Sequence, residues 1–373
     1  MTLKERRYDL DWLRVISVFA VFLHHVLMPF NGDNFHIMNV DHSKFLDDIM
    51  VYFEQFRLPL LFFISGVGTA FAFSKRSWKG FIIERARRLL IPLIFGVVVL
   101  IPPQVYYEKI FEFTSFREAY ITILFKLEVN HLWFLENLFL ISLLLIPFIL
   151  YIRSIKSLKI KSYIEVFTLR YGFSAWVIFL LILRIITKDF FPSNSKDFFN
   201  PSESLYFGFF FISGIVIARN RKLWEIILTN RRKNLLLFFI STIMFYLYYF
   251  FPGEYLKPNI SIVNRWRLWY FFCTLLTWFF ICTSLGYSQE YLNKKSNILK
   301  KLNEAVYPFY ILHQTVIIMI GYYIIKLNIS LLMKITILFT SSLVVIVIVY
   351  YLLIYNFRVI RFLFGMKREK LKK

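Results

Sequence analysis

Histidine and arginine side chains interrupt several long apolar stretches of this sequence, where they could do acid–base or anion-binding chemistry. In "DLDWLRVISVFAVFLHH", residues 9–25, Arg14 and His25 are eleven residues apart. Eleven residues are close to three helical turns, so on a helix the two side chains share a face, about 16 Å apart along the axis. A histidine buried in lipid usually lines an interior path. Two alternatives stay open: Arg14 could reach lipid phosphates, and His25 could be structural.

A second arginine and a further histidine lie deep inside other apolar stretches. Arg57, in "YFEQFRLPLLFFISGVGTAF", would cost about 3 kcal/mol in lipid unless it faces a cavity or a partner. Glu54, three residues earlier, could be that partner, which would make the pair purely structural. His313 lies at mid-depth of "NEAVYPFYILHQTVIIMIGYY", one turn after Tyr310. Its position again favours a polar interior.

The stretch "NHLWFLENLFL" combines an imidazole with a carboxylate. His131 is expected at the N-terminus of a helix, which favours its neutral form, the state that a base needs. Glu136 lies about one and a half turns deeper. Beside Trp133, however, His131 could equally belong to the aromatic belt of a membrane interface.

Two arginines three residues apart could form an anion site. Arg85 and Arg88 in "ERARRLLIP" share one face of a helix. A pair of guanidiniums beside Arg14 could bind a phosphate-rich ligand through bidentate hydrogen bonds. The alternative is that these residues only mark the cytoplasmic end of a membrane span.

These side chains belong to a chain of 373 residues that is 58% hydrophobic and 20% aromatic. Apolar runs of about 18 or more residues recur along it, and each is long enough to cross a bilayer as a helix. The runs are continuous rather than alternating, which argues against a transmembrane barrel. The sequence therefore predicts an all-α polytopic membrane protein with about ten transmembrane helices, over residues 10–29, 48–73, 89–107, 132–152, 172–187, 204–218, 234–251, 267–286, 304–325 and 331–355.

The basic residues predict the orientation of these spans. The formal net charge is +22, and with the N-terminus inside, about 31 of the Lys and Arg residues fall in cytoplasmic segments and about 11 on the other side. Both termini are therefore expected to be cytoplasmic, with a basic tail from about residue 356. The orientation of the spans already explains where the basic residues lie, so no nucleic-acid partner is expected. The loops are too short to fold alone, and residues 1–373 are predicted to form one membrane domain.

Sorted by expected depth, the polar residues form two groups and one intermediate. The arginines at the cytoplasmic side are Arg14, Arg85 and Arg88, and the outer half holds His25, Arg57, His131 and Glu136, with His313 between the groups. The histidines lie on separate helices without a carboxylate spacing that would hold zinc, so no metal is expected. This arrangement suits a protein that holds an anionic donor inside and presents its reactive end to an acceptor outside.

Five stretches in the same order also resemble the membrane acyltransferase-3 family. They are the Arg14–His25 pair, "FRLPLLFFISG", "RARRLLIP", "HLWFL" and "VYPFYILHQ", and they extend over nearly the full chain. The likeness is closest to the glucan-modifying branch known as glucan biosynthesis protein C. Some members of the family carry an extracellular hydrolase-like domain, which this sequence lacks, so the chain is expected to act alone or with a separate partner.

The resemblance implies an integral O-acyltransferase of the cell membrane. It would move an acyl group from cytoplasmic acyl-coenzyme A to a hydroxyl of a glycan or glycolipid at the outer face. Arg14, Arg85 and Arg88 would bind the phosphates of coenzyme A. His25 would accept the proton of the attacking hydroxyl, a role worth about 10²–10⁴-fold in rate.

The remaining members of the expected catalytic set are Arg57, His131, Glu136 and His313. Arg57 and His131 would stabilise the oxyanion or orient the sugar. Neither cysteine of the chain lies in a motif, which favours direct transfer over an acyl-enzyme.

Two other classes of protein stay open. In a transporter or flippase for a glycan or lipid-linked substrate, the same His and Arg residues would line the substrate path. The sequence has no pair of Gly- or Pro-broken helices in matching halves, the usual sign of inverted repeats. A scaffold without chemistry would leave the buried charges unexplained.

Overall fold

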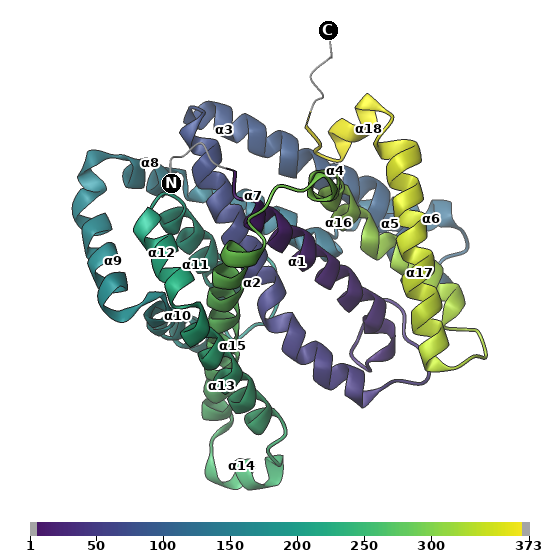
Figure 1. Cartoon of the computed structure of the whole chain (residues 1–373). Helices are drawn as coiled ribbons and strands as arrows, with labels where there is room; N and C mark the ends of the chain where they lie inside the picture. The colour runs from purple at the N-terminus through teal and green to yellow at the C-terminus, as the bar shows by residue number, and fades with distance from the viewer. Residues whose placement is uncertain (1–5, 368–373) are drawn as a thin grey trace. The chain divides into compact units, whose positions relative to one another are not determined.

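The computed structural model describes residues 6–367 of the chain (Figure 1). Within that range the structure contains no strands, and 82% of it is helical. The predicted all-α class is therefore confirmed. The end of the predicted basic tail, residues 368–373, lies outside the described residues, as does Lys4 at the other end.

Among residues 6–367, seven helical stretches are long and apolar enough to cross a membrane, and the number rises to ten if three bent helix pairs each count as one span. This agrees with the expected number of about ten. The pairs are Ile155–Tyr171 with Phe173–Phe190, bent by 114°, Pro201–Ile217 with Arg221–Thr229, bent by 111°, and Arg231–Tyr249 with Gly253–Asn259, bent by 83°. Ten spans would place both termini on one side of the membrane; that this side is cytoplasmic stays a prediction.

The helices divide into two compact units, each built from separate stretches of the chain. The first comprises Met1–Arg14, Gln55–Trp78 and Leu140–Lys295, and the second Val15–Glu54, Lys79–Phe139 and Ser296–Lys373. Four of the described helices have residues in both units: α1 (Tyr8–Leu27), α2 (Lys44–Ser74), α7 (Trp133–Leu144) and, by its first residue alone, α3 (Trp78–Arg85). The expectation of one membrane domain stays a prediction.

The first unit contains most of the helices from the middle of the chain. Its helices α13 (Arg231–Tyr249) and α15 (Ile262–Tyr291) run side by side, with α14 (Gly253–Asn259) at their shared end (Figure 1). The others are α8 (Ile146–Arg153), α9 (Leu158–Tyr171), α10 (Val177–Phe190), α11 (Pro201–Ile217) and α12 (Arg221–Thr229), with the short turns η6 (Ile155–Ser157) and η7 (Phe173–Trp176).

Two glycines bring α2 and α11 into backbone contact within the first unit. A Cβ on Gly66 would collide with the carbonyl oxygen of Phe211, and one on Gly214 would collide with that of Phe63. Small residues at helix crossings allow this close approach in membranes. Gly68 has nothing within 4 Å of its would-be Cβ. The packing role expected for "FISGVG" therefore holds for Gly66 but not for Gly68.

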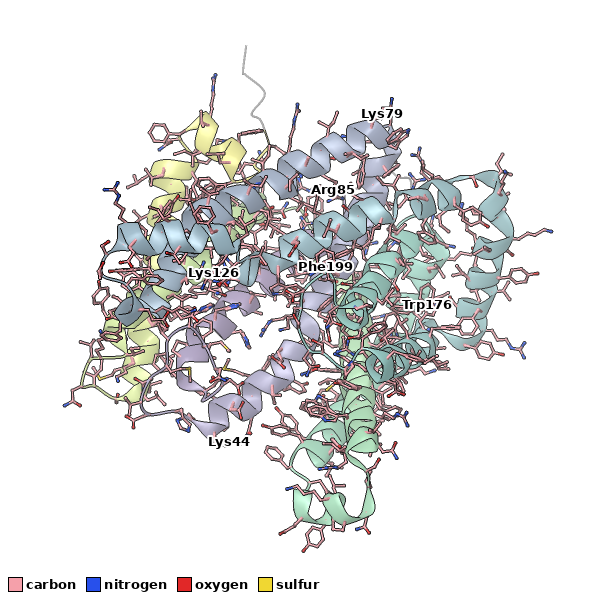
Figure 2. The ribbon with its side chains drawn as sticks, turned by 180° about the vertical axis from the view of Figure 1, so that it is seen from behind. Lys44, Lys79, Arg85, Lys126, Trp176 and Phe199 are labelled. Carbon is pink, nitrogen blue, oxygen red and sulfur yellow. The ribbon has the colours of Figure 1, made fainter. Side chains whose placement is uncertain are left out.

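The second unit contains a continuous helical stretch from Trp78 to Glu108, 31 residues long. Figure 2 shows Lys79 and Arg85 on this stretch. Its parts are α3 (Trp78–Arg85), η2 (Ala86–Leu90), α4 (Ile91–Phe95), η3 (Gly96–Leu100) and α5 (Ile101–Glu108). The helix α16 (Asn297–Ile324) packs against α5 and α17 (Leu331–Val349). The chain then continues through η8 (Tyr350–Ile354) to α18 (Arg358–Leu363).

The stretch 108–131, expected as an outer loop, contains a helix of its own. The helix α6 (Phe116–Lys126) lies between the turns η4 (Ile110–Glu112) and η5 (Asn130–Leu132). Its N-cap is Ser115, whose hydroxyl accepts the backbone N–H of Glu118, a common way to satisfy the first turn. Burial of Ala119 and Ile123 then fixes it against the unit. The expectation missed this helix because its apolar content is too low for a span.

Prolines inside the spans leave carbonyl oxygens without their helical donor, and hydroxyls from other helices replace it. Pro59 cannot donate to Gln55, and the Thr277 hydroxyl donates to that carbonyl oxygen at 3.0 Å. In the second unit Pro92 likewise leaves the Arg88 carbonyl to the Tyr307 hydroxyl, at 2.5 Å. Such replacement is needed because lipid offers no hydrogen bonds.

Candidate active site

Three of the predicted histidines come together in the second unit. His25 lies on α1, His131 on η5 and His313 on α16. The His25 Nδ1 atom is 3.3 Å from the Nε2 atom of His313. The ring of His313 is also 5.2 Å, centroid to centroid, from that of His131. His131 and His313 are buried, at 5% and 1% exposure, and His25 is half-buried, so this histidine cluster extends from the interior of the unit toward its surface.

Backbone carbonyls assign the tautomer of each ring, because a carbonyl oxygen can only accept a hydrogen bond. The Nδ1–H of His25 donates to the Val21 carbonyl at 2.8 Å, and the Nδ1–H of His313 donates to that of Tyr310. Both rings therefore carry their lone pair on Nε2. The single Nδ1–H of His25 is therefore shared between the Val21 carbonyl and the Nε2 lone pair of His313. The basic nitrogen of His25 is its Nε2 atom, the kind of atom that a general base needs.

The third ring has the opposite tautomer. The Nε2–H of His131 donates to the Ile311 carbonyl at 3.0 Å, which puts its lone pair on Nδ1. The Nε2 amide group of Gln104 lies 3.4 Å from that Nδ1. Within residues 6–367, no group of three or more His, Cys, Asp or Glu side chains could hold a metal ion.

Gln104 on α5 is fully buried and joins the neighbouring polar side chains. Its amide group donates to the Thr315 hydroxyl at 2.7 Å, and its carbonyl oxygen accepts from Gln314 at 3.2 Å. Thr315 in turn donates to the Leu100 carbonyl at 3.1 Å. Gln104 was not among the predicted site residues, although its side chain is the only amide in the apolar span 89–107. That isolation was the available signal.

The local backbone explains why Gln104 can make these contacts. The segment η3, which ends at Leu100, is a π-helix, and Pro102 and Pro103 follow it. Wide π turns and prolines both remove regular i→i+4 bonds, and π turns occur often at functional sites. At this junction the Leu100 carbonyl accepts from the Thr315 hydroxyl of α16, the same hydroxyl that Gln104 contacts.

A histidine–carboxylate pair that was not predicted lies at the C-terminal end of α5. The Nδ1–H of His36, in the segment between α1 and α2, donates to the Glu108 carboxylate. The His36 Nε2 atom accepts from the Gln314 amide at 3.0 Å. Sequence reasoning had no signal for this pair, because 72 residues separate its members.

The other predicted carboxylate, Glu136, lies in the second unit on α7. It is half-buried, five residues after His131. Asn137 beside it is turned back onto its own helix, where its side chain donates to the Trp133 carbonyl at 3.2 Å.

Arg85 and Arg88 also belong to the second unit, at the start of its long helical stretch. The Arg85 guanidinium lies 4.8 Å from the centre of the Phe81 ring, and the Arg88 Nε atom lies 3.4 Å from a Glu84 carboxylate oxygen. The segment η2 that contains Arg88 is a π-helix. Its turns are wider than the α turns from which a shared face was expected.

The two remaining predicted residues lie in the first unit. Arg14 is the last residue of that unit on α1, and its guanidinium contacts Asp11 at 3.3 Å, with 35% of the side chain exposed. Arg57 on α2 is buried, with 6% exposure. Near the start of α1, Asp9 is fully buried and accepts two hydrogen bonds from Arg7.

Comparison with known proteins gives one match. The family model described as an acyltransferase domain, of the acyltransferase-3 family, matches residues 7–353, a range that includes every predicted site residue. No curated protein and no solved structure matches the chain. The model covers most of the sequence, and the helices that it covers are those of a multi-pass membrane protein. The chain therefore belongs to the membrane acyltransferase-3 family.

Proposed function

We propose that this membrane acyltransferase moves an acyl group from acyl-coenzyme A, bound from the cytoplasmic side, to a hydroxyl of a glycan or glycolipid outside. The contact between His25 and His313 is the observation that carries the proposal. It holds an imidazole inside the membrane domain with a basic nitrogen, as acyl transfer to an alcohol requires.

The His25 Nε2 atom takes the proton of the acceptor hydroxyl while the oxygen attacks the thioester carbonyl. A C–O bond forms, and the tetrahedral intermediate then breaks its C–S bond. The imidazolium returns the proton to the departing sulfur, so the products are an ester and the coenzyme A thiol. No proton is gained or lost overall, and one histidine serves as base and then as acid.

His313 has a supporting role in this scheme. Its Nε2 lone pair faces the Nδ1–H of His25 at 3.3 Å. When His25 becomes an imidazolium, that hydrogen bond becomes charge-assisted and strengthens. Both nitrogens of His131 already have partners within 3.4 Å. We therefore assign His131 the role of positioning His313 and Gln104.

The donor would bind with its phosphates at Arg85 and Arg88. The Arg88 carbonyl contacts the Tyr307 hydroxyl on α16, and His313 lies six residues further along that helix, about 9 Å along its axis. The long Arg88 side chain adds to this separation. An extended pantetheine arm, which separates the phosphates of coenzyme A from its thioester, suits such a distance.

Among the other predicted residues, Glu136 is part of the proposal. Glu136 would orient the acceptor, while stabilisation of the oxyanion by Arg57 and donor binding by Arg14 stay predictions from the sequence. Both cysteines of the chain, Cys273 and Cys282, are buried in the first unit. The second unit, which contains the histidine cluster, has no cysteine of its own, and this favours direct transfer.

The test uses vesicles with the protein in a known orientation. Acyl-coenzyme A with a radiolabelled acyl group is supplied on the cytoplasmic side, and a glucan oligosaccharide on the other. The proposal expects label in the oligosaccharide, with release of one thiol for each ester formed. Movement of unmodified oligosaccharide without incorporation of label would contradict it and favour a transporter.

A further inference from the structure

The second unit carries a polar and aromatic group that the catalytic scheme does not use. It consists of His36, Glu108, Tyr107 and Tyr323, which we call the outer cluster. We propose that the outer cluster binds the acceptor and selects a hydroxyl-rich ring, that is, a carbohydrate. This inference rests on the proposed function and assigns the acceptor subsite to it.

The Glu108 carboxylate, held by His36, can accept hydrogen bonds from a ligand. The side chains are 19% and 33% exposed, so a ligand in solution can reach them. The carboxylate takes one N–H from His36, which leaves it further lone pairs for hydroxyl donors. Carboxylates that accept hydroxyl hydrogen bonds give strong, directional contacts.

The pair is more than a solvated surface ion pair, because it is joined to the histidine cluster. Gln314, which is buried at 3% exposure, donates to the His36 Nε2 atom at 3.0 Å. Gln314 directly follows His313 in the sequence. The Phe35 ring lies 6.2 Å from the His25 ring and 5.1 Å from the His36 ring. An acceptor held at His36 is therefore one aromatic ring away from the catalytic base.

Tyrosines complete the outer cluster on the adjacent helix ends. Tyr107 precedes Glu108 on α5, and its hydroxyl lies 3.1 Å from that of Tyr323 near the end of α16. The Tyr323 side chain is well exposed, at 60%. The rings of Tyr106 and Tyr322 contact Tyr107 as well. Rigid rings with a hydroxyl offer a sugar both a stacking face and a polar tip.

Interfacial tyrosines also occur simply as membrane anchors. An anchor, however, does not need a histidine–carboxylate pair hydrogen-bonded to a buried glutamine. A proton exit path is not needed either, because the proposed reaction releases no proton. Acceptor binding is the role that uses the carboxylate, the imidazole and the rings together.

The experiment measures how the acyl group divides between sugar and water. Purified full-length protein in nanodiscs receives radiolabelled acyl-coenzyme A, and label is counted in a glucan oligosaccharide and in free acid. The variants are Glu108→Gln and His36→Gln, with Tyr323→Ala as a third. The control is Glu118→Gln, the same change at an exposed carboxylate of α6 in the same unit.

We expect Glu108→Gln and His36→Gln to raise the KM for the oligosaccharide about tenfold, the loss of one charge-assisted hydrogen bond. Donor KM and the rate of hydrolysis should stay as in the wild type, and saturating oligosaccharide should restore the transfer rate. Tyr323→Ala should act in the same direction, and Glu118→Gln should change nothing.

Two failures are distinguishable. If the wild type transfers label to the sugar but Glu108→Gln keeps its acceptor KM, or loses transfer and hydrolysis equally, the outer cluster is structural and only this inference is overturned. If the wild type transfers no label to any sugar, the proposed function fails, and the acceptor subsite with it.

Discussion

The substitution His313→Phe removes the hydrogen bond that supports His25 but leaves His25, the proposed base, in place. Phenylalanine keeps a ring on α16 but removes the Nε2 acceptor that faces the Nδ1–H of His25 at 3.3 Å. A hydrogen bond to a charged partner contributes about 1.5–3 kcal/mol. Each 1.36 kcal/mol changes a rate tenfold. Because 3.3 Å is long for such a bond, we expect kcat to fall about 10- to 100-fold.

The matched variant is His313→Gln, whose side-chain oxygen can still accept from His25. It should retain more activity than His313→Phe, with both donor and acceptor KM near the wild type. The assay is the initial rate of label transfer in nanodiscs, after circular dichroism has shown that each variant is folded. A wild-type kcat in His313→Phe, or an equal loss of kcat in His313→Phe and His313→Gln, would show that His313 does not support His25 through a hydrogen bond.

Three further predictions address donor binding and folding. Arg85→Gln combined with Arg88→Gln should raise the donor KM at least tenfold and leave the acceptor KM unchanged; an unaltered donor saturation curve would make these arginines topology signals only. Gln104→Leu breaks contacts with Thr315 and Gln314 among others, and should lower the free energy of unfolding by about 1–3 kcal/mol, measured by thermal unfolding in detergent. Gly66→Ala should lower the free energy of unfolding by about 1–3 kcal/mol through overpacking, whereas Gly68→Ala should leave it unchanged. Similar stability of the two variants would contradict the packing of α2 on α11.

The sequence allowed prediction of the features that depend on local composition. Long apolar runs predicted the helical spans, because a membrane helix needs only length and hydropathy. The bends after Tyr171 and Ile217 lie at limits of the predicted spans 172–187 and 204–218, but their angles were not predictable, since composition does not give the direction in which the chain continues. The helix α6 was missed for the converse reason, because it is a capped helix with too little apolar length.

The candidate site was predictable only where a residue conflicts with its surroundings. His25 and His313 were identified because an ionisable side chain inside an apolar run is costly. The contact between them joins positions 288 residues apart, and nothing local indicates it. His36 lies in an ordinary polar segment, so it gave no such conflict. The tautomers, which decide which nitrogen is basic, depend on backbone carbonyls and need three-dimensional structure.

Whether His25 is the general base is best measured by the rate of a single acyl transfer in a His25→Gln variant. Glutamine can still donate to the His313 Nε2 atom or the Val21 carbonyl but has no basic nitrogen. We expect a folded protein that binds acyl-coenzyme A normally and transfers its acyl group at least about 10²-fold more slowly, the lower limit for loss of a general base. Transfer at the wild-type rate would contradict the role of His25, because the base would then be another group.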